Sequence, residues 1–142
     1  MNKPSLNKKP LRILIAEDDD INAIVFTDLL ESEGFLVTRA SDGDEALNHL
    51  CTGEFDLALI DINLGFGSID GTEVLKLYKQ ASVFHKIPIV AVTAFAMQSD
   101  KEKFMAAGFD SYLPKPVFME DLLKLIKDLQ IKVEKKQQED LR

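Results

Sequence analysis

The apolar run Asp56-Leu57-Ala58-Leu59-Ile60-Asp61, residues 56–61, has the length and composition of a buried parallel strand that ends on a carboxylate. Two further runs also end on polar side chains. Residues 11–16 lead into the acids Glu17-Asp18-Asp19-Asp20, and residues 89–92 lead into Thr93. The carboxyl ends of parallel strands meet at one edge of an open α/β sheet. We therefore expect the acids and the hydroxyl to share one crevice there.

Helical patterns separate the strands and define the fold class. Five βα units predict a flavodoxin-like (βα)5 fold, in which a central five-stranded parallel sheet carries helices on both faces. The remaining strands are expected from Phe35 to Thr38 and from Asp110 to Leu113. The helices are expected where apolar residues recur at helical spacing or where caps stand: Ile21, Ile24, Val25 and Leu29 before Gly34; Gly43 to Leu50 after a Ser41 or Asp42 cap; Val74, Leu75, Leu77 and Tyr78; Met97 to Ala107 before Gly108; and Phe118, Leu122, Leu125, Ile126, Leu129 and Val133.

The expected crevice has the chemistry of a phosphoryl site. Several carboxylates held close together repel one another, and a hard divalent cation such as Mg²⁺ relieves that repulsion. The metal would recruit phosphate oxygens, while Thr93 and Lys115 supply donors to the oxygens that the metal leaves free. The group contains no serine or cysteine beside a histidine. A carboxylate is therefore the expected nucleophile, and Asp61 is the best placed to form an aspartyl phosphate.

These positions resemble the receiver domains of two-component response regulators, over roughly residues 11–129. The resemblance rests on Glu17-Asp18, Asp61, Thr93-Ala94 and the run Tyr112-Leu113-Pro114-Lys115-Pro116, in the family's order. The segments 91–97 and 106–110 look most like receivers of hybrid histidine kinases or single-domain regulators. The two rival classes fit less well. A haloacid-dehalogenase-like phosphatase would have an acid where Asn63 stands, and a flavodoxin would have a Ser/Thr-rich loop where the four acids stand.

The resemblance implies the ligands of the metal. Asp18 would bind Mg²⁺ directly and Glu17 through water, while Asp61 and the backbone carbonyl of Asn63 complete the set. Asp19 would then be a loop or helix-cap residue, as would the acid that follows it.

It also implies the groups that handle the phosphoryl group. Asp61 would be the phosphoacceptor. The Thr93 hydroxyl and the backbone N–H of Ala94 would donate to the phosphoryl oxygens. Lys115 would pair with Asp61 before phosphorylation, aimed by a cis bond to the following proline. Tyr112 would be the switch aromatic that turns inward as Thr93 moves.

The implied function is a phosphoacceptor switch of a phosphorelay rather than an enzyme, although the domain would assist its own Mg²⁺-dependent phosphorylation and dephosphorylation. The implied partners are a histidine kinase or histidine phosphotransfer protein and a downstream protein target. The alternative is a phosphorylation-independent interaction module that keeps only the fold, a pseudo-receiver. The loop after Asp61 keeps that alternative open, because it is two residues longer than in many receivers and Gly65 and Gly67 favour mobility. We also expect Phe95 to slow loss of the phosphoryl group by restricting water.

Composition limits the other function classes. The 142 residues suit one domain, and a net charge of −7 disfavours direct nucleic-acid binding. No apolar run approaches the roughly 18 residues of a membrane span, and Cys51 is the single cysteine, so a reducing, cytoplasmic setting without a membrane is expected. The expected organisation is a disordered basic arm over residues 1–10, the receiver over 11–130, and a polar helical extension or tail over 131–142. A weak homodimer through that extension is left open.

Overall fold

The computed structural model describes residues 10–65, 67–81, 87–94 and 97–140, with side chains to residue 129. Strands and helices alternate throughout, as predicted. The strands are β1 (Arg12–Ala16), β2 (Leu36–Ala40), β3 (Leu57–Asp61), β4 (Ile89–Thr93) and β5 (Ser111–Pro114). The helices are α1 (Asp20–Ser32), α2 (Gly43–Thr52), α3 (Gly71–Ala81), α4 (Gln98–Ala107) and α5 (Met119–Asp140).

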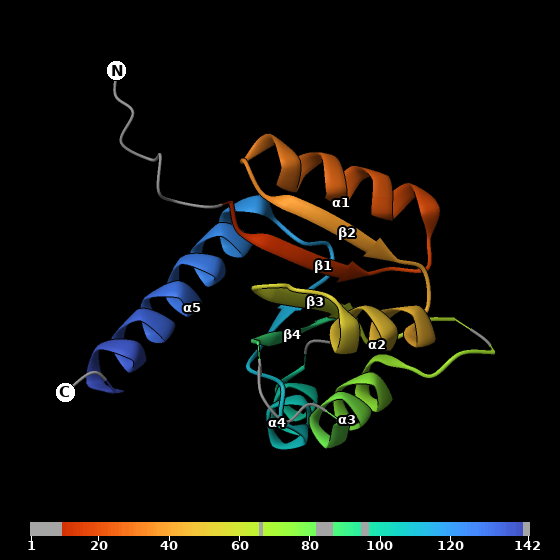
Figure 1. The fold of residues 1–142 in the computed structure, drawn as a ribbon. Coiled ribbons are helices and arrows are strands. Elements are labelled where there is room, and N and C mark those ends of the chain that lie inside the picture. The colour runs from red at the N-terminus through yellow and green to blue at the C-terminus, as the bar shows by residue number, and fades with distance from the viewer. Residues whose placement is uncertain (1–9, 66, 82–86, 95–96, 141–142) are drawn as a thin grey trace.

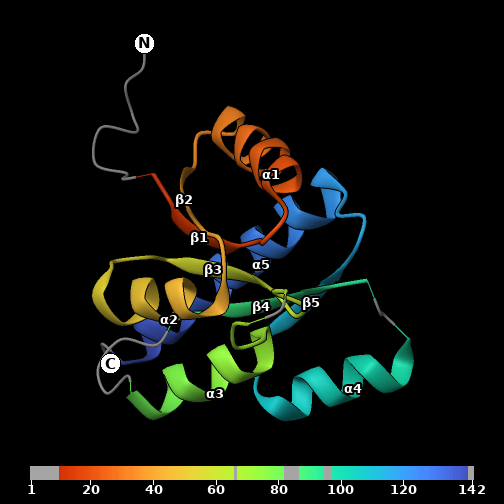
Figure 2. The same cartoon turned by 90° about the vertical axis from the view of Figure 1, so that its right-hand side faces the viewer.

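The five strands form one parallel sheet in the order β2-β1-β3-β4-β5. Helices α1 and α5 cover one face, and α2, α3 and α4 cover the other (Figures 1 and 2). The three central strands β1, β3 and β4 are almost wholly buried because helices cover both of their faces. The flavodoxin-like prediction is confirmed, and the order places the ends of β1, β3, β4 and β5 along one edge.

Two hydrophobic cores lie on either side of the sheet. Alternate residues of each strand point to opposite faces, so Leu14 and Ile60 pack towards α2 and α3, whereas Ile13 and Leu59 pack towards α1 and α5. Leu122 and Ile126 attach α5 to the second core and are 0% and 3% exposed. Packed cores on both faces therefore support the sheet beneath the loops that follow its strands.

Helix α1 forms where its apolar spacing predicts it, but those apolar residues are not its packed face. Ile21, Ile24, Val25 and Leu29 are 73%, 60%, 53% and 42% exposed. At 100° per residue they occupy one side of the helix, and the buried Ala23 and Leu30 lie on the opposite side. The helix therefore exposes an apolar surface to solvent.

The apolar pattern places the start of α5 one residue too early, at Phe118 instead of Met119. Phe118 is 63% exposed because it precedes the first helical residue, and its carbonyl accepts the first helical hydrogen bond from Leu122 N at 3.1 Å. The helix continues to Asp140 and extends past the sheet (Figure 1). Across the described residues, the structure contains no helix with the length and apolar character of a membrane span.

The helix ends follow the predicted capping chemistry. Asp42, not Ser41, is the N-cap of α2, and its carboxylate accepts from Glu45 N at 2.8 Å. Gly108 ends α4 with a φ of 111°, the left-handed conformation that glycine adopts without strain. The expected N-terminal arm, apart from Pro10, and the expected role of Phe95 lie outside the described residues.

Candidate functional site

A pocket of about 500 Å³ opens at the carboxyl edge of the sheet. All of the predicted site residues except Tyr112 line it. The lining residues are Glu17, Asp18, Asp19, Asn22, Asp61, Ile62, Asn63, Asp70, Thr93, Ala94 and Lys115. Side chains that are far apart in the sequence therefore meet where the parallel strands end, as the sheet rule predicts.

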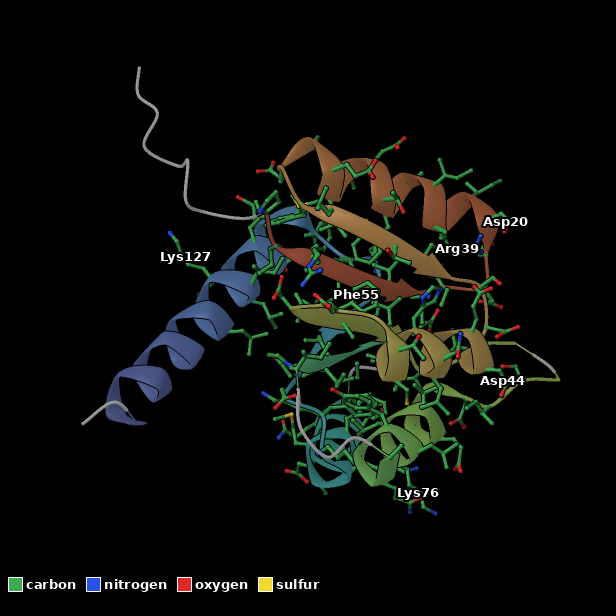
Figure 3. The ribbon with its side chains drawn as sticks, viewed as in Figure 1. Asp20, Arg39, Asp44, Phe55, Lys76 and Lys127 are labelled. Atoms are coloured by element: carbon green, nitrogen blue, oxygen red, sulfur yellow. The ribbon has the colours of Figure 1, made fainter. Side chains whose placement is uncertain are left out.

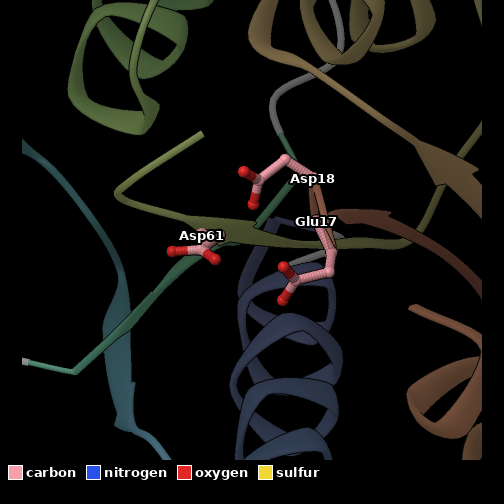
Figure 4. A group of neighbouring side chains, drawn as sticks. All are labelled: Glu17, Asp18 and Asp61. Carbon is pink, nitrogen blue, oxygen red and sulfur yellow. The ribbon is translucent and has the colours of Figure 1, made fainter. Parts of the chain in front are cut away.

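Three carboxylates form the acidic centre of the pocket. Glu17, Asp18 and Asp61 each offer an oxygen within 4.8 Å of the others (Figure 4). Glu17 and Asp61 are buried, at 6% and 4% exposure, while Asp18 is exposed. Mg²⁺ prefers oxygen ligands and usually keeps several of its waters, so it needs only a few protein ligands and a side open to solvent. This cluster offers both. The acidic pocket therefore fits a Mg²⁺ site.

Both carboxylate oxygens of Asp61 are held. Oδ1 accepts a hydrogen bond from Asn63 N at 3.0 Å, and Oδ2 accepts one from Lys115 Nζ at 2.5 Å. Gly71 supports the same residue from behind, because a Cβ at that position would lie 2.5 Å from the Asp61 carbonyl oxygen. The end of β3 therefore fixes the direction in which Asp61 faces the pocket.

Lys115 is positioned by its backbone as well as by its charge. The Lys115-Pro116 bond is cis, as the resemblance implied, and Lys115 N donates to Thr93 O at 2.7 Å. Its ammonium contacts Glu17 Oε1 at 3.4 Å as well as Asp61, a second partner that the sequence did not indicate. Burial alone would lower the pKa of Lys115, but the hydrogen bond and charge of Asp61, together with those of Glu17, outweigh burial and raise it.

Glu17 is held through both its side chain and its backbone. Its Oε2 accepts from Asp19 N at 3.1 Å, and its backbone N donates to Ala40 O at 3.0 Å. Burial raises the pKa of Glu17, and the neighbouring charge of Asp61 acts in the same direction, while the Asp19 hydrogen bond and Lys115 oppose the rise. This carboxylate therefore gains from a cation placed beside it.

Asp19 takes the capping role that was predicted for it. It is the N-cap of α1, and its Oδ1 accepts from Asn22 N at 3.0 Å. Asp20 follows as the first helical residue and contributes no lining atoms to the pocket. The first two of the four consecutive acids thus belong to the acidic cluster, and the last two begin the helix, with Asp19 also lining the pocket.

Thr93 and Ala94 border the pocket, but Tyr112 lies outside it. Thr93 is buried at the end of β4, and Ala94 is exposed just beyond it. Tyr112 is half-buried on β5, where the ammonium of Lys101 in α4 lies 5.3 Å from its ring centre. The aromatic ring is thus linked to α4.

The longer loop after Asp61 is attached to α2. Ser68 Oγ accepts a hydrogen bond from Gly43 N at 2.8 Å, and Leu64 is only 2% exposed. A Cβ on Gly43 would lie 2.1 Å from the Ile69 carbonyl oxygen, so the backbones approach closely there. Gly65 adopts a φ of 85° beside Asp18. The extra length is accommodated by contacts that glycine makes feasible.

Sequence reasoning missed some polar neighbours of the site. Asn22 and Asp70 line the pocket, and Asp70 also caps the start of α3 by accepting from Glu73 N at 2.9 Å. Arg39, on β2, donates from Nε to Glu17 O at 2.9 Å. Nothing in the local sequence indicates this contact, because it depends on β2 lying next to β1.

Comparisons with known proteins agree with this geometry. The family model described as the response regulator receiver domain matches residues 13–127. The polar-differentiation response regulator DivK of Brucella anthropi is 36% identical over 118 residues, which cover 83% of this chain and 94% of DivK.

Two solved structures are similar in both sequence and fold. The receiver domain of the sensor histidine kinase PA1611 of Pseudomonas aeruginosa, with a magnesium ion coordinated in its active-site cleft, matches with a TM-score of 0.76 and 30% identity over 85% of this chain and 98% of that one. The receiver domain of Saccharomyces cerevisiae Ssk1, crystallised with the histidine phosphotransfer protein Ypd1, belongs to a structure that matches with a TM-score of 0.73 and 30% identity over 84% and 88%.

Proposed function

The chain belongs to the response regulator receiver domain family, the phosphoacceptor switches of two-component signalling, and we propose that its phosphoacceptor is Asp61. One observation carries the assignment. Asp61 is a buried carboxylate with one oxygen on Lys115 and with Glu17 and Asp18 close by. Glu17 shares these neighbours, but its contact with the Lys115 ammonium is longer, at 3.4 Å against 2.5 Å for Asp61.

We propose that the reaction is transfer of a phosphoryl group from a phosphohistidine. An oxygen of Asp61 forms a bond to phosphorus, the P–N bond to the histidine breaks, and its electron pair returns to the imidazole nitrogen. Lys115 holds the charge of a transferring oxygen, while the Thr93 hydroxyl and Ala94 N–H bind the others. The domain contributes positioning and electrostatic stabilisation, so it assists both its own phosphorylation and the later hydrolysis of the aspartyl phosphate.

Glu17, Asp18, Asp61 and the Asn63 carbonyl would hold Mg²⁺. When bound, the ion supplies positive charge to the acids and to the phosphoryl oxygens. The proposal is supported by the oxygen donors gathered in the pocket and by the magnesium-bound relative from Pseudomonas aeruginosa. Asn63 N already bonds to Asp61 Oδ1, which brings the Asn63 backbone to the same place.

Phosphorylation would act as a switch through Thr93, Lys115 and Tyr112. The new phosphoryl group carries up to two negative charges into a site where one ammonium already contacts two carboxylates. Thr93 is drawn towards it, and Lys115 follows because its backbone N is bonded to Thr93 O. Tyr112 lies on β5, the strand that leads to Lys115, and contacts α4. The output would be an altered affinity for a downstream protein at the α4 and β5 surface.

The phosphodonor would dock on α1. Asn22 of that helix lines the pocket, and the exposed Ile21, Ile24 and Val25 extend an apolar surface from the pocket rim. A donor histidine must come within bonding distance of Asp61, so the protein that carries it has to contact this rim. We propose a histidine kinase or histidine phosphotransfer protein there, supported by the crystallised pair of Ypd1 and the Ssk1 receiver.

Intact-mass analysis tests the assignment. The wild-type chain and Asp61→Asn are incubated with acetyl phosphate, with Mg²⁺ or with EDTA. The expected result is a gain of one phosphoryl group in the wild-type chain with Mg²⁺ that is absent from Asp61→Asn and from the EDTA samples. Asp70→Asn is the matched control, because Asp70 also lines the pocket but has no contact with Lys115. Failure with acetyl phosphate and with a phosphorylated histidine protein would favour the phosphorylation-independent module.

A further inference from the structure

Arg39 contacts the acidic loop from a strand that contributes no lining residue to the pocket. It lies on β2, where it pairs in register with Ile15 of β1. Its Nε donates to the Glu17 carbonyl oxygen at 2.9 Å, and its Nη1 lies 2.9 Å from Asp20 Oδ1. Figure 3 shows Arg39 reaching Asp20 at the start of α1. One planar guanidinium therefore spans both ends of the segment Glu17–Asp20.

The contact with Glu17 O fixes a peptide plane that bears on the metal site. The carbonyl of Glu17 belongs to the peptide that joins Glu17 to Asp18. Glu17 N is also held, by Ala40 O at 3.0 Å, so β2 restrains the backbone on both sides of Glu17. Asp18 is exposed, and the position of its carboxylate depends on the direction in which that peptide leaves the sheet.

Arg39 is poorly explained as a source of stability alone. Its Asp20 partner is 82% exposed, and such ion pairs contribute little in water. Among the described residues, Arg39 Nη2 is buried without a hydrogen-bond partner, which costs free energy. A shorter residue would avoid that cost. The long planar side chain is suited to holding two groups at a fixed spacing.

We propose that Arg39 is a positioning residue for the metal site, which sets the orientation of Asp18 towards Glu17 and Asp61 by holding the Glu17 carbonyl. The proposal rests on the proposed function, since it concerns the same Mg²⁺ site. A purely electrostatic role predicts the opposite effect. A guanidinium near the acids repels a cation, so a role through charge alone would make Mg²⁺ bind more tightly once the charge is removed.

Two substitutions at Arg39 separate geometry from charge. Arg39→Lys keeps the charge but loses the planar fork, and Arg39→Gln loses both. Arg12→Lys is the matched control, because Arg12 lies on the adjacent strand at the opposite end and pairs with the exposed Glu54 at 3.3 Å. The dissociation constant for Mg²⁺ is measured from the amide shifts of Asp18 and Asn63 in ¹H–¹⁵N spectra, which report only folded molecules. The amide shift of Asp18 without metal is an independent readout.

Positioning predicts that both Arg39 variants bind Mg²⁺ more weakly, by about 10-fold, the lower end for a residue that orients a metal ligand. The Asp18 amide shift should change without metal, and the Mg²⁺ concentration that half-saturates phosphorylation by acetyl phosphate should rise in parallel. Arg12→Lys should match the wild-type chain. Unchanged affinity in Arg39→Lys, or tighter binding in Arg39→Gln, would overturn the inference. If the wild-type chain itself neither binds Mg²⁺ nor gains a phosphoryl group, the proposed function fails first.

Discussion

Lys115 Nζ lies 2.5 Å from Asp61 Oδ2, so the ammonium is paired with one oxygen of the carboxylate that we propose as the phosphoacceptor. The same nitrogen is 3.4 Å from Glu17 Oε1. One cation therefore contacts two buried acids. Any group that adds charge to this pocket must change the partners of Lys115.

The titration of Lys115 should report this pairing. Asp61 and Glu17 raise its pKa above the ordinary value of 10.5, against the lowering effect of burial. A raised lysine pKa stabilises the folded state at every pH below 10.5, and that stability is lost as the pH rises through the raised value. In Asp61→Asn the charged partner is gone, so the pKa of Lys115 should fall.

NMR of the lysine side chains measures this pKa directly, and chemical denaturation between about pH 9 and 12 measures its consequence for the free energy of unfolding. The wild-type chain should lose more of its unfolding free energy over that range than Asp61→Asn. Equal Lys115 pKa values in the two proteins would contradict the pairing.

Gly71→Ala should damage both the fold and the site. A Cβ there would lie 2.5 Å from Asp61 O and 2.9 Å from Ile62 Cα, and neither backbone atom can move aside cheaply. We expect a loss of about 1–3 kcal/mol of unfolding free energy, as for other overpacked sites, and slower phosphorylation of Asp61. Thr72→Ala, at the next and exposed position of α3, is the control. If Gly71→Ala changes neither the unfolding free energy nor the phosphorylation rate, the close packing described between β3 and α3 is ruled out.

The cation–π contact between Lys101 and Tyr112 should couple α4 to β5. The ammonium is 5.3 Å from the ring centre, a geometry worth about 0.5–1 kcal/mol at an exposed site. A double-mutant cycle with Lys101→Ala and Tyr112→Leu, followed by denaturation, measures the coupling. Lys103→Ala provides the control, since it removes an exposed lysine from the same helix. Strictly additive losses at Lys101 and Tyr112 would show that the contact contributes nothing in solution.

The sequence predicts the residues at the carboxyl edge of the sheet well, because the apolar runs that indicate strands end on the polar residues of the site. Residues 57–60 and 89–92 are continuous β-branched and aliphatic runs, and each ends on a polar residue. Burial of such runs on both faces leaves only the parallel, helix-covered sheet. The meeting of Asp61, Thr93 and Lys115 then follows from the topology, without knowledge of any contact.

Other features could not be predicted because they depend on long-range contacts. The spacing of Ile21, Ile24, Val25 and Leu29 indicates a helix, but periodicity does not say which side of a helix meets the sheet. That side is the one with Ala23, Leu30 and the half-buried Phe26, which packs against the α1 and α5 core. Arg39 is similar. Its contact with Glu17 requires β2 to lie next to β1, and no local pattern carries that information.

The exposed side of α1 gives a test of the docking proposal. Ile24 and Val25 are 60% and 53% exposed, so replacing both with glutamine, a good helix former, should leave the unfolding free energy nearly unchanged. If a phosphohistidine protein buries them beside the pocket, losing 1 or 2 kcal/mol of contact should slow phosphotransfer from it by about 5–30-fold. Phosphorylation by acetyl phosphate needs no such surface and should keep its rate.

The ratio of the two rates therefore separates docking from chemistry. The assay compares initial rates from acetyl phosphate and from a phosphorylated histidine phosphotransfer protein that is active on the wild-type chain. Met105→Gln is the matched control, because Met105 is 43% exposed on α4, across the sheet from α1. If the initial rate from the protein donor falls in the α1 variant but not in Met105→Gln, the donor binds on α1. If the rate from the protein donor falls equally in Met105→Gln, or does not fall in the α1 variant, the donor does not bind specifically to α1. Met105→Gln is a fair comparison because it also removes exposed apolar surface.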